Sequence, residues 1–123
     1  MSRLLAVPAS NPTLCTRFHA AIELIGRRWA GAIIQLLMSG RKRYCDLKGG
    51  IPDISDRMLS ERLRELEQEG LLRRIVTPET PVRVEYELTK KGSGLHDALD
   101  AIGQWAHTWI QPESRPKARR KSA

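Results

Sequence analysis

Cysteines, long apolar runs and catalytic motifs are all scarce in this 123-residue chain. Two cysteines, Cys15 and Cys45, do not make a disulfide framework, so both are expected to be reduced. No apolar run approaches the roughly 20 residues of a membrane span, and no signal peptide opens the chain, so we expect a cytoplasmic protein without a membrane partner. No Gly-rich phosphate loop, paired-carboxylate site or Ser/Cys–His arrangement stands out, which predicts a protein that is not an enzyme and needs no cofactor.

Acidic residues are in the minority, with 14 Asp and Glu against 21 Lys and Arg, which gives a net charge of +7. This balance favours a polyanionic partner, nucleic acid first and an anionic membrane surface second. Residues 111–123 hold five basic residues and one acidic residue, so they carry four of the seven net charges. We expect them to form a disordered basic tail, residues 1–13 a flexible arm, and residues 14–110 one folded domain.

Apolar residues at helical spacing predict several helices in the first half of the chain. The first helix is closed by Gly26, and a second covers about 28–38. A basic connector, 41–43, leads to a short third helix over 44–48, which the glycine pair 49–50 ends.

Residues 51–74 predict the helix around which the chain is organised. Ser55 fits its N-cap and Gly70 its left-handed C-terminal residue. The apolar stripe of this helix consists of Leu59, Leu63 and Leu66. The opposite face carries Arg57, Ser60, Glu61 and Arg64. Taken alone, this pattern fits an ordinary solvated helix as well as a DNA recognition helix.

After Gly70 the apolar period changes from helical to two. Alternation over 82–88 predicts a strand, with 72–76 as its antiparallel partner and 77–81 as a proline-bearing turn. Thr89 then caps a long last helix that Pro112 stops. The third and fourth helices form a helix-turn-helix and the hairpin forms a wing. The predicted fold class is therefore α+β, mostly α: a winged helix-turn-helix with additional terminal helices.

Four segments carry a resemblance to a bacterial family. They are IELIGRRW (22–29), RYCDL (43–47), ISDRMLSERLRELEQEGLLRR (54–74) and PVRVEYELTKKG (81–92). From Cys15 to about Trp109 the chain resembles the HxlR-type winged helix-turn-helix transcriptional regulators. The resemblance implies a homodimer that binds double-stranded operator DNA through paired winged units, with its terminal helices at the dimer interface.

The candidate DNA contacts lie on the fourth helix and around it. Arg57, Ser60 and Arg64 can reach base edges or phosphates from its outward face. Arginine at position 74 either pairs with a wing carboxylate or contacts a phosphate. For the basic connector and the wing, phosphate contact competes with plain solvation. The full set of predicted DNA-binding residues is Arg41, Lys42, Arg43, Ser55, Arg57, Ser60, Arg64, Arg74 and Arg83.

Cys15 is a candidate sensor. Some HxlR-type regulators respond to oxidants or electrophiles through a cysteine just before the first helix, and Cys15 stands there, followed by Thr16 where the family often has proline. The helix start and Arg17 would favour its reactive thiolate. The alternative is an ordinary half-buried small residue, and Cys45 is a weaker candidate. Cys15 with His19, or His96 with His107, could contribute to a metal site, but the spacing does not bring together the ligands that one requires, so no metal site is predicted.

A long apolar stripe on the last helix predicts the dimer interface. Left exposed, it would form a larger patch than soluble monomers usually tolerate, and a two-fold partner would cover it. With two residues of the first helix, the predicted interface comprises Phe18, Ile22, Leu95, Leu99, Ile102, Trp105, Ala106 and Trp109. The predicted function is a dimeric, sequence-specific DNA-binding regulator, with Cys15 as a candidate sensor of oxidants or electrophiles. The alternatives are a metal- or small-ligand-responsive regulator and a winged protein-interaction module without DNA binding.

Overall fold

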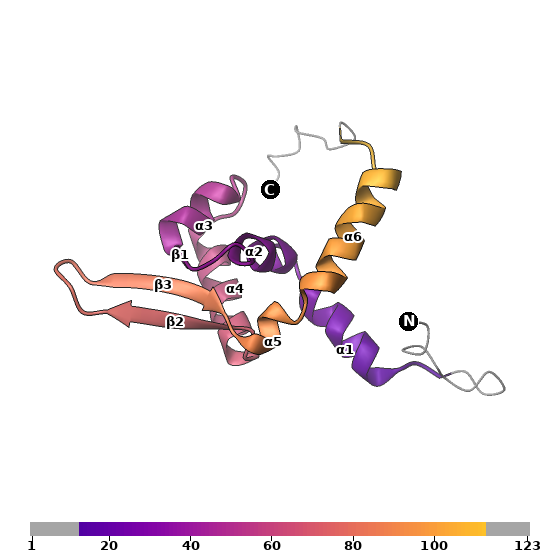
Figure 1. The fold of residues 1–123 in the computed structure, drawn as a ribbon, viewed down its shortest axis with the longest axis horizontal. Helices are drawn as coiled ribbons and strands as arrows, with labels where there is room; N and C mark the ends of the chain where they lie inside the picture. Colours follow the sequence, from indigo (N-terminus) through magenta and orange to yellow (C-terminus); the bar gives the residue numbers. More distant parts are fainter. Residues whose placement is uncertain (1–12, 113–123) are drawn as a thin grey trace.

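The computed structural model describes residues 13–112, and its elements follow the predicted order (Figure 1). The elements are α1 (Thr16–Ile25), α2 (Ala30–Leu37), β1 (Lys42–Arg43), α3 (Tyr44–Gly50), α4 (Asp56–Gln68), β2 (Leu72–Thr77), β3 (Arg83–Leu88), α5 (Lys90–Ser93) and α6 (His96–Trp109). Apart from Thr13, Gln111 and Pro112, the predicted arm and tail lie outside the described residues. No helix between residues 13 and 112 is long and apolar enough to cross a membrane.

The core packs one face of α4 against α2, α3 and the base of the hairpin. Its fully buried members include Ile33 and Ile34 of α2, Leu47 of α3, and Leu71 and Leu72 at the start of β2. The predicted α4 stripe joins them, with Leu59, Leu63 and Leu66 exposed by 2% or less. A helix of 13 residues whose apolar face is fully buried holds its opposite face in a fixed orientation.

The sheet is antiparallel with strand order β1–β3–β2. The predicted hairpin is confirmed, with Leu72 paired to Leu88 and Thr77 to Arg83. Strand β1 was missed, because residues 41–43 were predicted to be a connector. Lys42 and Arg43 pair with Tyr86 and Glu85 of β3, and two residues are too short a run to show a strand period.

Helix boundaries differ from the prediction at the start of α2 and at the end of α3. This helix begins at Ala30 rather than near residue 28, because Trp29 has a left-handed backbone with φ of 73°. Helix α3 continues through the glycine pair 49–50 instead of ending before it.

The predicted long last helix is two helices. Thr89 caps only α5, where its hydroxyl accepts the Gly92 N–H, and Leu95 precedes α6. A Cβ at position 92 would lie 2.1 Å from the carbonyl oxygen of Leu71, so this close approach requires glycine. Gly92 and Gly94 also weaken helix propensity where the chain turns. Helix α6 ends at Trp109, before the proline that was expected to stop it.

The terminal helices and the hairpin lie on opposite sides of the fold. In Figure 1, β2 and β3 project to one side of the α2–α4 centre, whereas α1 and α6 extend from the other side. The wing and the two terminal helices are therefore free to contact different partners.

Candidate nucleic-acid interface

Helix α4 presents an exposed polar face with a fixed start. The Ser55 hydroxyl accepts the backbone N–H of Met58 at 3.0 Å, as an N-cap does. Arg57, Ser60 and Arg64 are exposed on the face opposite the buried leucines. Within residues 13–112, Arg57 and Arg64 make no hydrogen bond or ion pair, so both guanidinium groups are available to an external acceptor.

Tyr44, a residue to which sequence analysis gave no role, connects α3 to the start of α4. Its hydroxyl lies 2.9 Å from Asp56 Oδ1, 3.1 Å from the Asp56 carbonyl oxygen and 3.4 Å from Ser60 Oγ. Lys48 Nζ stands 3.8 Å from the same carboxylate oxygen. Desolvation raises the pKa of the Tyr44 hydroxyl; the hydrogen bond with Ser60 lowers it and the one with Asp56 raises it. The contacts fix the two helices of the motif relative to each other.

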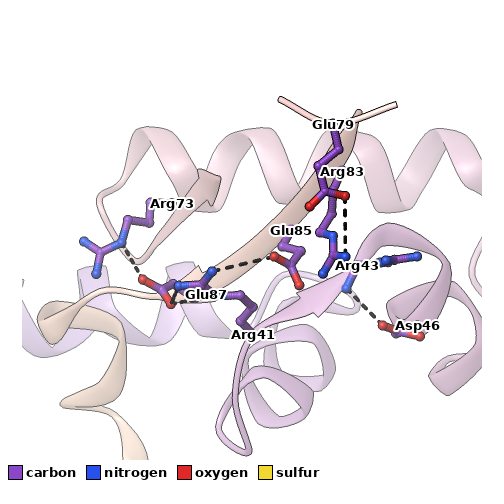
Figure 2. Close-up of polar contacts among 8 residues, drawn as sticks. All are labelled: Arg41, Arg43, Asp46, Arg73, Glu79, Arg83, Glu85 and Glu87. Atoms are coloured by element: carbon purple, nitrogen blue, oxygen red, sulfur yellow. Dashed lines mark hydrogen bonds and ion pairs between the residues drawn. The ribbon is translucent and has the colours of Figure 1, made fainter. Parts of the chain in front are cut away.

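The wing strand β3 carries two carboxylates that hold arginines from neighbouring segments (Figure 2). Glu87 accepts from Arg73 Nε at 2.8 Å and from Arg41 Nη2 at 3.1 Å. Arg41 also lies 3.6 Å from Glu85. The hydrogen bond from Arg73 holds the pKa of Glu87 below its ordinary value, although loss of hydration partly opposes this, and Arg41 adds to the lowering. Arg41, predicted to contact phosphate, therefore belongs to an ion-pair network on the sheet.

The other residues of the basic connector have local roles. Lys42 Nζ donates to the Ser39 hydroxyl at 2.9 Å. Arg43 is the N-cap residue of α3, and its backbone N–H donates to Asp46 at 3.0 Å. Its guanidinium group makes no ion pair within the described residues, so Arg43 has the most available cation of the three.

At the wing, Arg83 and Arg74 differ in their contacts. Arg83 Nη2 lies 3.5 Å from Glu79, near the turn of the hairpin (Figure 2), and its buried Nε has no partner among the described atoms. Arg74 is exposed and makes no ion pair between residues 13 and 112. Its neighbour Arg73 instead holds the wing carboxylate of Glu87. The alternative in which Arg74 pairs with a wing carboxylate is therefore wrong, because the neighbouring Arg73 makes that pair. Arg74 stays a candidate phosphate contact.

A second link that sequence analysis missed joins α4 to the α1–α2 connection. Arg62 Nε donates to the carbonyl oxygen of Arg28 at 2.8 Å. Arg62 and Arg27 both contact Glu65 Oε1, at 3.1 and 3.2 Å. The bond from Arg62 to Arg28 could not be predicted, because periodicity cannot distinguish Arg62 from its outward neighbours.

Comparison with known proteins decides what this arrangement is. The model of the HxlR-like helix-turn-helix family matches residues 24–114. The chain belongs to this family. It is 46% identical over 99 residues to an uncharacterized HTH-type transcriptional regulator, YvaP of Bacillus subtilis, covering 80% of this chain and 92% of that protein. It is 45% identical over 100 residues to the HTH-type transcriptional regulator YodB of the same organism, covering 81% and 89%.

Solved structures of a transcriptional regulator and a redox regulator share the fold. The reduced form of YodB from Bacillus subtilis superposes with a TM-score of 0.72 at 44% identity, covering 81% of this chain and 98% of that one. The oxidized form of the redox regulator HypR gives 0.74 at 31% identity, covering 79% and 99%. The chain is therefore a winged helix-turn-helix transcriptional regulator of the HxlR type, as the sequence segments predicted.

In this HxlR-like chain Cys15 is the N-cap residue of α1. Its Sγ accepts the backbone N–H of Phe18 at 3.4 Å, and the residue is half-buried. Cys45 is exposed on α3. His96 and His107 both line a hollow of about 280 Å³ between α2 and α6. Across residues 13–112, no three His, Cys, Asp or Glu residues come close enough to hold a metal ion.

The predicted dimer residues divide into two groups. Leu95 and Leu99 are partly buried and pack against the core, and Ala106 is half-buried. The other five are large apolar side chains that the core does not cover, and their exposed fractions are 52% for Phe18, 43% for Ile22, 51% for Ile102, 58% for Trp105 and 69% for Trp109. These five residues of α1 and α6 are called the apolar surface below.

Proposed function

We propose that this regulator acts as a homodimer that binds operator DNA, with α4 in the major groove. The observation that carries the proposal is the outward face of α4, where Arg57, Ser60 and Arg64 are exposed while the opposite face is fully buried. An arginine can bond to guanine O6 and N7, and a serine hydroxyl to several base edges. In this proposal the regulator acts in the cytoplasm, where operator DNA lies, and its function involves no enzymatic step.

Phosphate contacts would come from both sides of α4. Arg43, at the N-cap of α3, and Arg74, on β2, offer cations that make no ion pair in the described part of the chain. Arg41 and Arg83 are held by carboxylates of the wing, so each must exchange a carboxylate for a phosphate if it contacts DNA. Lys42 is already bonded to Ser39.

A second copy of the chain is the partner that the apolar surface favours. Five large apolar side chains, three of them on α6, are more than half or nearly half exposed. Scattered apolar residues are normal on a surface, but five large ones gathered on the two terminal helices favour an interaction site. A two-fold dimer would cover it and would place two α4 helices about one DNA turn apart.

An oxidant or electrophile is the signal that we propose, with Cys15 as the sensor. Cys15 lies at the N-terminus of α1, the helix that carries two residues of the apolar surface. A change at its sulfur would therefore act on the proposed dimer. Structures of the relative YodB include diamide-treated and quinone-bound forms. A small ligand in place of an oxidant is the alternative signal.

The test is selection of bound sequences from a random duplex pool, carried out with and without diamide. We expect enrichment of a pseudo-palindromic site, salt-dependent affinity for it, and loss of binding on diamide treatment. Cys15→Ser should bind DNA but ignore diamide, and the matched variant Cys45→Ser should behave as wild type. Binding that is absent at low salt would favour a protein-interaction module instead. Binding that ignores diamide would remove Cys15 as the sensor.

A further inference from the structure

The hydrogen-bond directions at the start of α4 constrain what Ser60 can read. Among residues 13–112, Tyr44 Oη has three hydrogen-bonding oxygen neighbours: Asp56 Oδ1 at 2.9 Å, the Asp56 carbonyl oxygen at 3.1 Å and Ser60 Oγ at 3.4 Å. Tyr44 is half-buried, whereas Ser60 is exposed on the outward face of α4.

The count of protons decides the donor in the contact between Tyr44 and Ser60. A phenol has a single proton to donate. Both Asp56 oxygens are acceptors only, because one is a backbone carbonyl oxygen and the other belongs to a carboxylate that is paired with Lys48 at 3.8 Å. Whichever Asp56 oxygen takes the Tyr44 proton, none is left for Ser60. The contact therefore consists of the Ser60 hydroxyl donating to Tyr44 Oη.

This direction leaves Ser60 with one role toward DNA. With its only proton engaged by Tyr44 Oη, the Ser60 hydroxyl can only accept a hydrogen bond from a base. In the major groove the hydrogen-bond donors are the amino groups of adenine N6 and cytosine N4, whereas guanine O6 and N7 and thymine O4 are acceptors.

We propose that Tyr44 is a specificity-determining residue, which fixes Ser60 as a hydrogen-bond acceptor so that Ser60 selects a base with an exocyclic amino group. The inference rests on the proposed function, because it assumes that α4 reads bases. Tyr44 acts through Ser60 and is a positioning residue. Removing its hydroxyl frees the Ser60 proton, so that Ser60 can also donate to the keto oxygen of guanine or thymine.

The experiment compares four proteins on the site selected by the wild type: wild type, Tyr44→Phe, Ser60→Ala and, as matched control, Tyr86→Phe. Phenylalanine retains the Tyr44 ring, and Tyr86 is a tyrosine of the core that makes no hydrogen bond through its hydroxyl among residues 13–112. The position read by Ser60 is the one at which base changes lose their effect in Ser60→Ala. At that position adenine is replaced by purine, or cytosine by 2-pyrimidinone, which deletes only the amino group. Affinities are measured by fluorescence anisotropy.

Deleting the amino group should weaken wild-type binding by about fivefold to tenfold, as a single hydrogen bond to a base would. In Tyr44→Phe the same deletion, or a change to a keto base, should cost about twofold or less, while other positions keep their effects. Tyr86→Phe should match wild type.

Three results would overturn the inference. The first is a Tyr44→Phe protein with wild-type base preferences. The second is a wild-type protein that is indifferent to amino deletion at the Ser60 position. The third is a Tyr44→Phe protein that loses affinity equally for all sequences, which would show a structural role alone. If the wild type selects no sequence at all, the proposed function fails, and that outcome is visible before any variant is made.

Discussion

Arg62→Ala and Arg64→Ala should impair different properties, although the two residues stand only two positions apart on α4. The Arg62 side chain is only 16% exposed, donates to the carbonyl oxygen of Arg28 at 2.8 Å and contacts Glu65 at 3.1 Å. Arg64 is exposed and makes no hydrogen bond or ion pair with any residue in the range 13–112. We therefore expect Arg62→Ala to destabilise the fold and Arg64→Ala to weaken DNA binding.

The magnitude follows from the bonds that each change removes. A hydrogen bond to a charged donor contributes about 1.5–3 kcal/mol to stability, and water can reach the exposed Arg28, so the lower part of this range applies. The ion pair with Glu65, whose side chain is 32% exposed, adds little. A loss of about 1.5–2 kcal/mol should lower the Tm by about 6–16 °C in a domain of this size. Arg64→Ala should change stability by no more than about 0.5 kcal/mol.

Thermal unfolding followed by far-UV circular dichroism, at one protein concentration, measures the first effect. Fluorescence anisotropy with the selected operator measures the second, where Arg64→Ala should lose about 5- to 150-fold in affinity if it contacts a base. Equal melting temperatures for the two variants would refute the reasoning about Arg62. An Arg64→Ala protein with full affinity would remove Arg64 from the proposed interface.

Four further predictions concern stability and assembly. Gly92→Ala should destabilise the domain by about 1–3 kcal/mol in urea unfolding, because the added Cβ would meet the Leu71 carbonyl oxygen. Gly103→Ala, where a Cβ meets nothing within 4 Å, should instead stabilise α6 by about 0.5–1 kcal/mol, and the reverse order would contradict both. Ile102→Glu should sediment as a monomer and lose operator binding, because it places a charge within the proposed interface; a dimeric, binding variant would locate the interface elsewhere. The lowered pKa of Glu87 means that its contribution to stability is present above its ordinary value of 4.5 and is lost as the pH falls through the folded-state pKa. Glu87→Gln should therefore melt below wild type at pH 7, with the two curves converging in acid, and a constant difference across pH would count against this network.

The parts of the fold that periodicity describes could be predicted from the sequence. Leu59, Leu63 and Leu66 fix one face of α4, and their spacing alone identifies which side faces outward. The hairpin was equally readable, since β3 alternates over enough residues to show its period. Ser55 and Gly70 marked the ends of α4 through the backbone conformations that those positions require.

Contacts between elements could not be predicted, because they depend on register and on the direction of single side chains. Arg73 faces Glu87 directly across β2 and β3, but the proline-bearing turn left the register open, so the sequence could not show that Arg73 rather than Arg74 meets the wing carboxylate. Tyr44 lies 12 residues from Asp56, and only the packing of α3 on α4 brings the two together. The left-handed Trp29 and the break before α6 likewise come from tertiary packing, which overrides helical periodicity.

Arginines of this fold form two groups, those that pair with a carboxylate and those that do not. Arg62, Arg73 and Arg41 are each paired with a glutamate, and each joins one element to another. Arg57, Arg64 and Arg74 have no acidic partner in the described part of the chain. An unpaired guanidinium has no carboxylate to displace before it meets a phosphate or a base, whereas a paired one must give up its bond first. Most of the DNA affinity should therefore come from the second group, all of whose members were predicted from the sequence to bind DNA, as was Arg41 of the first group.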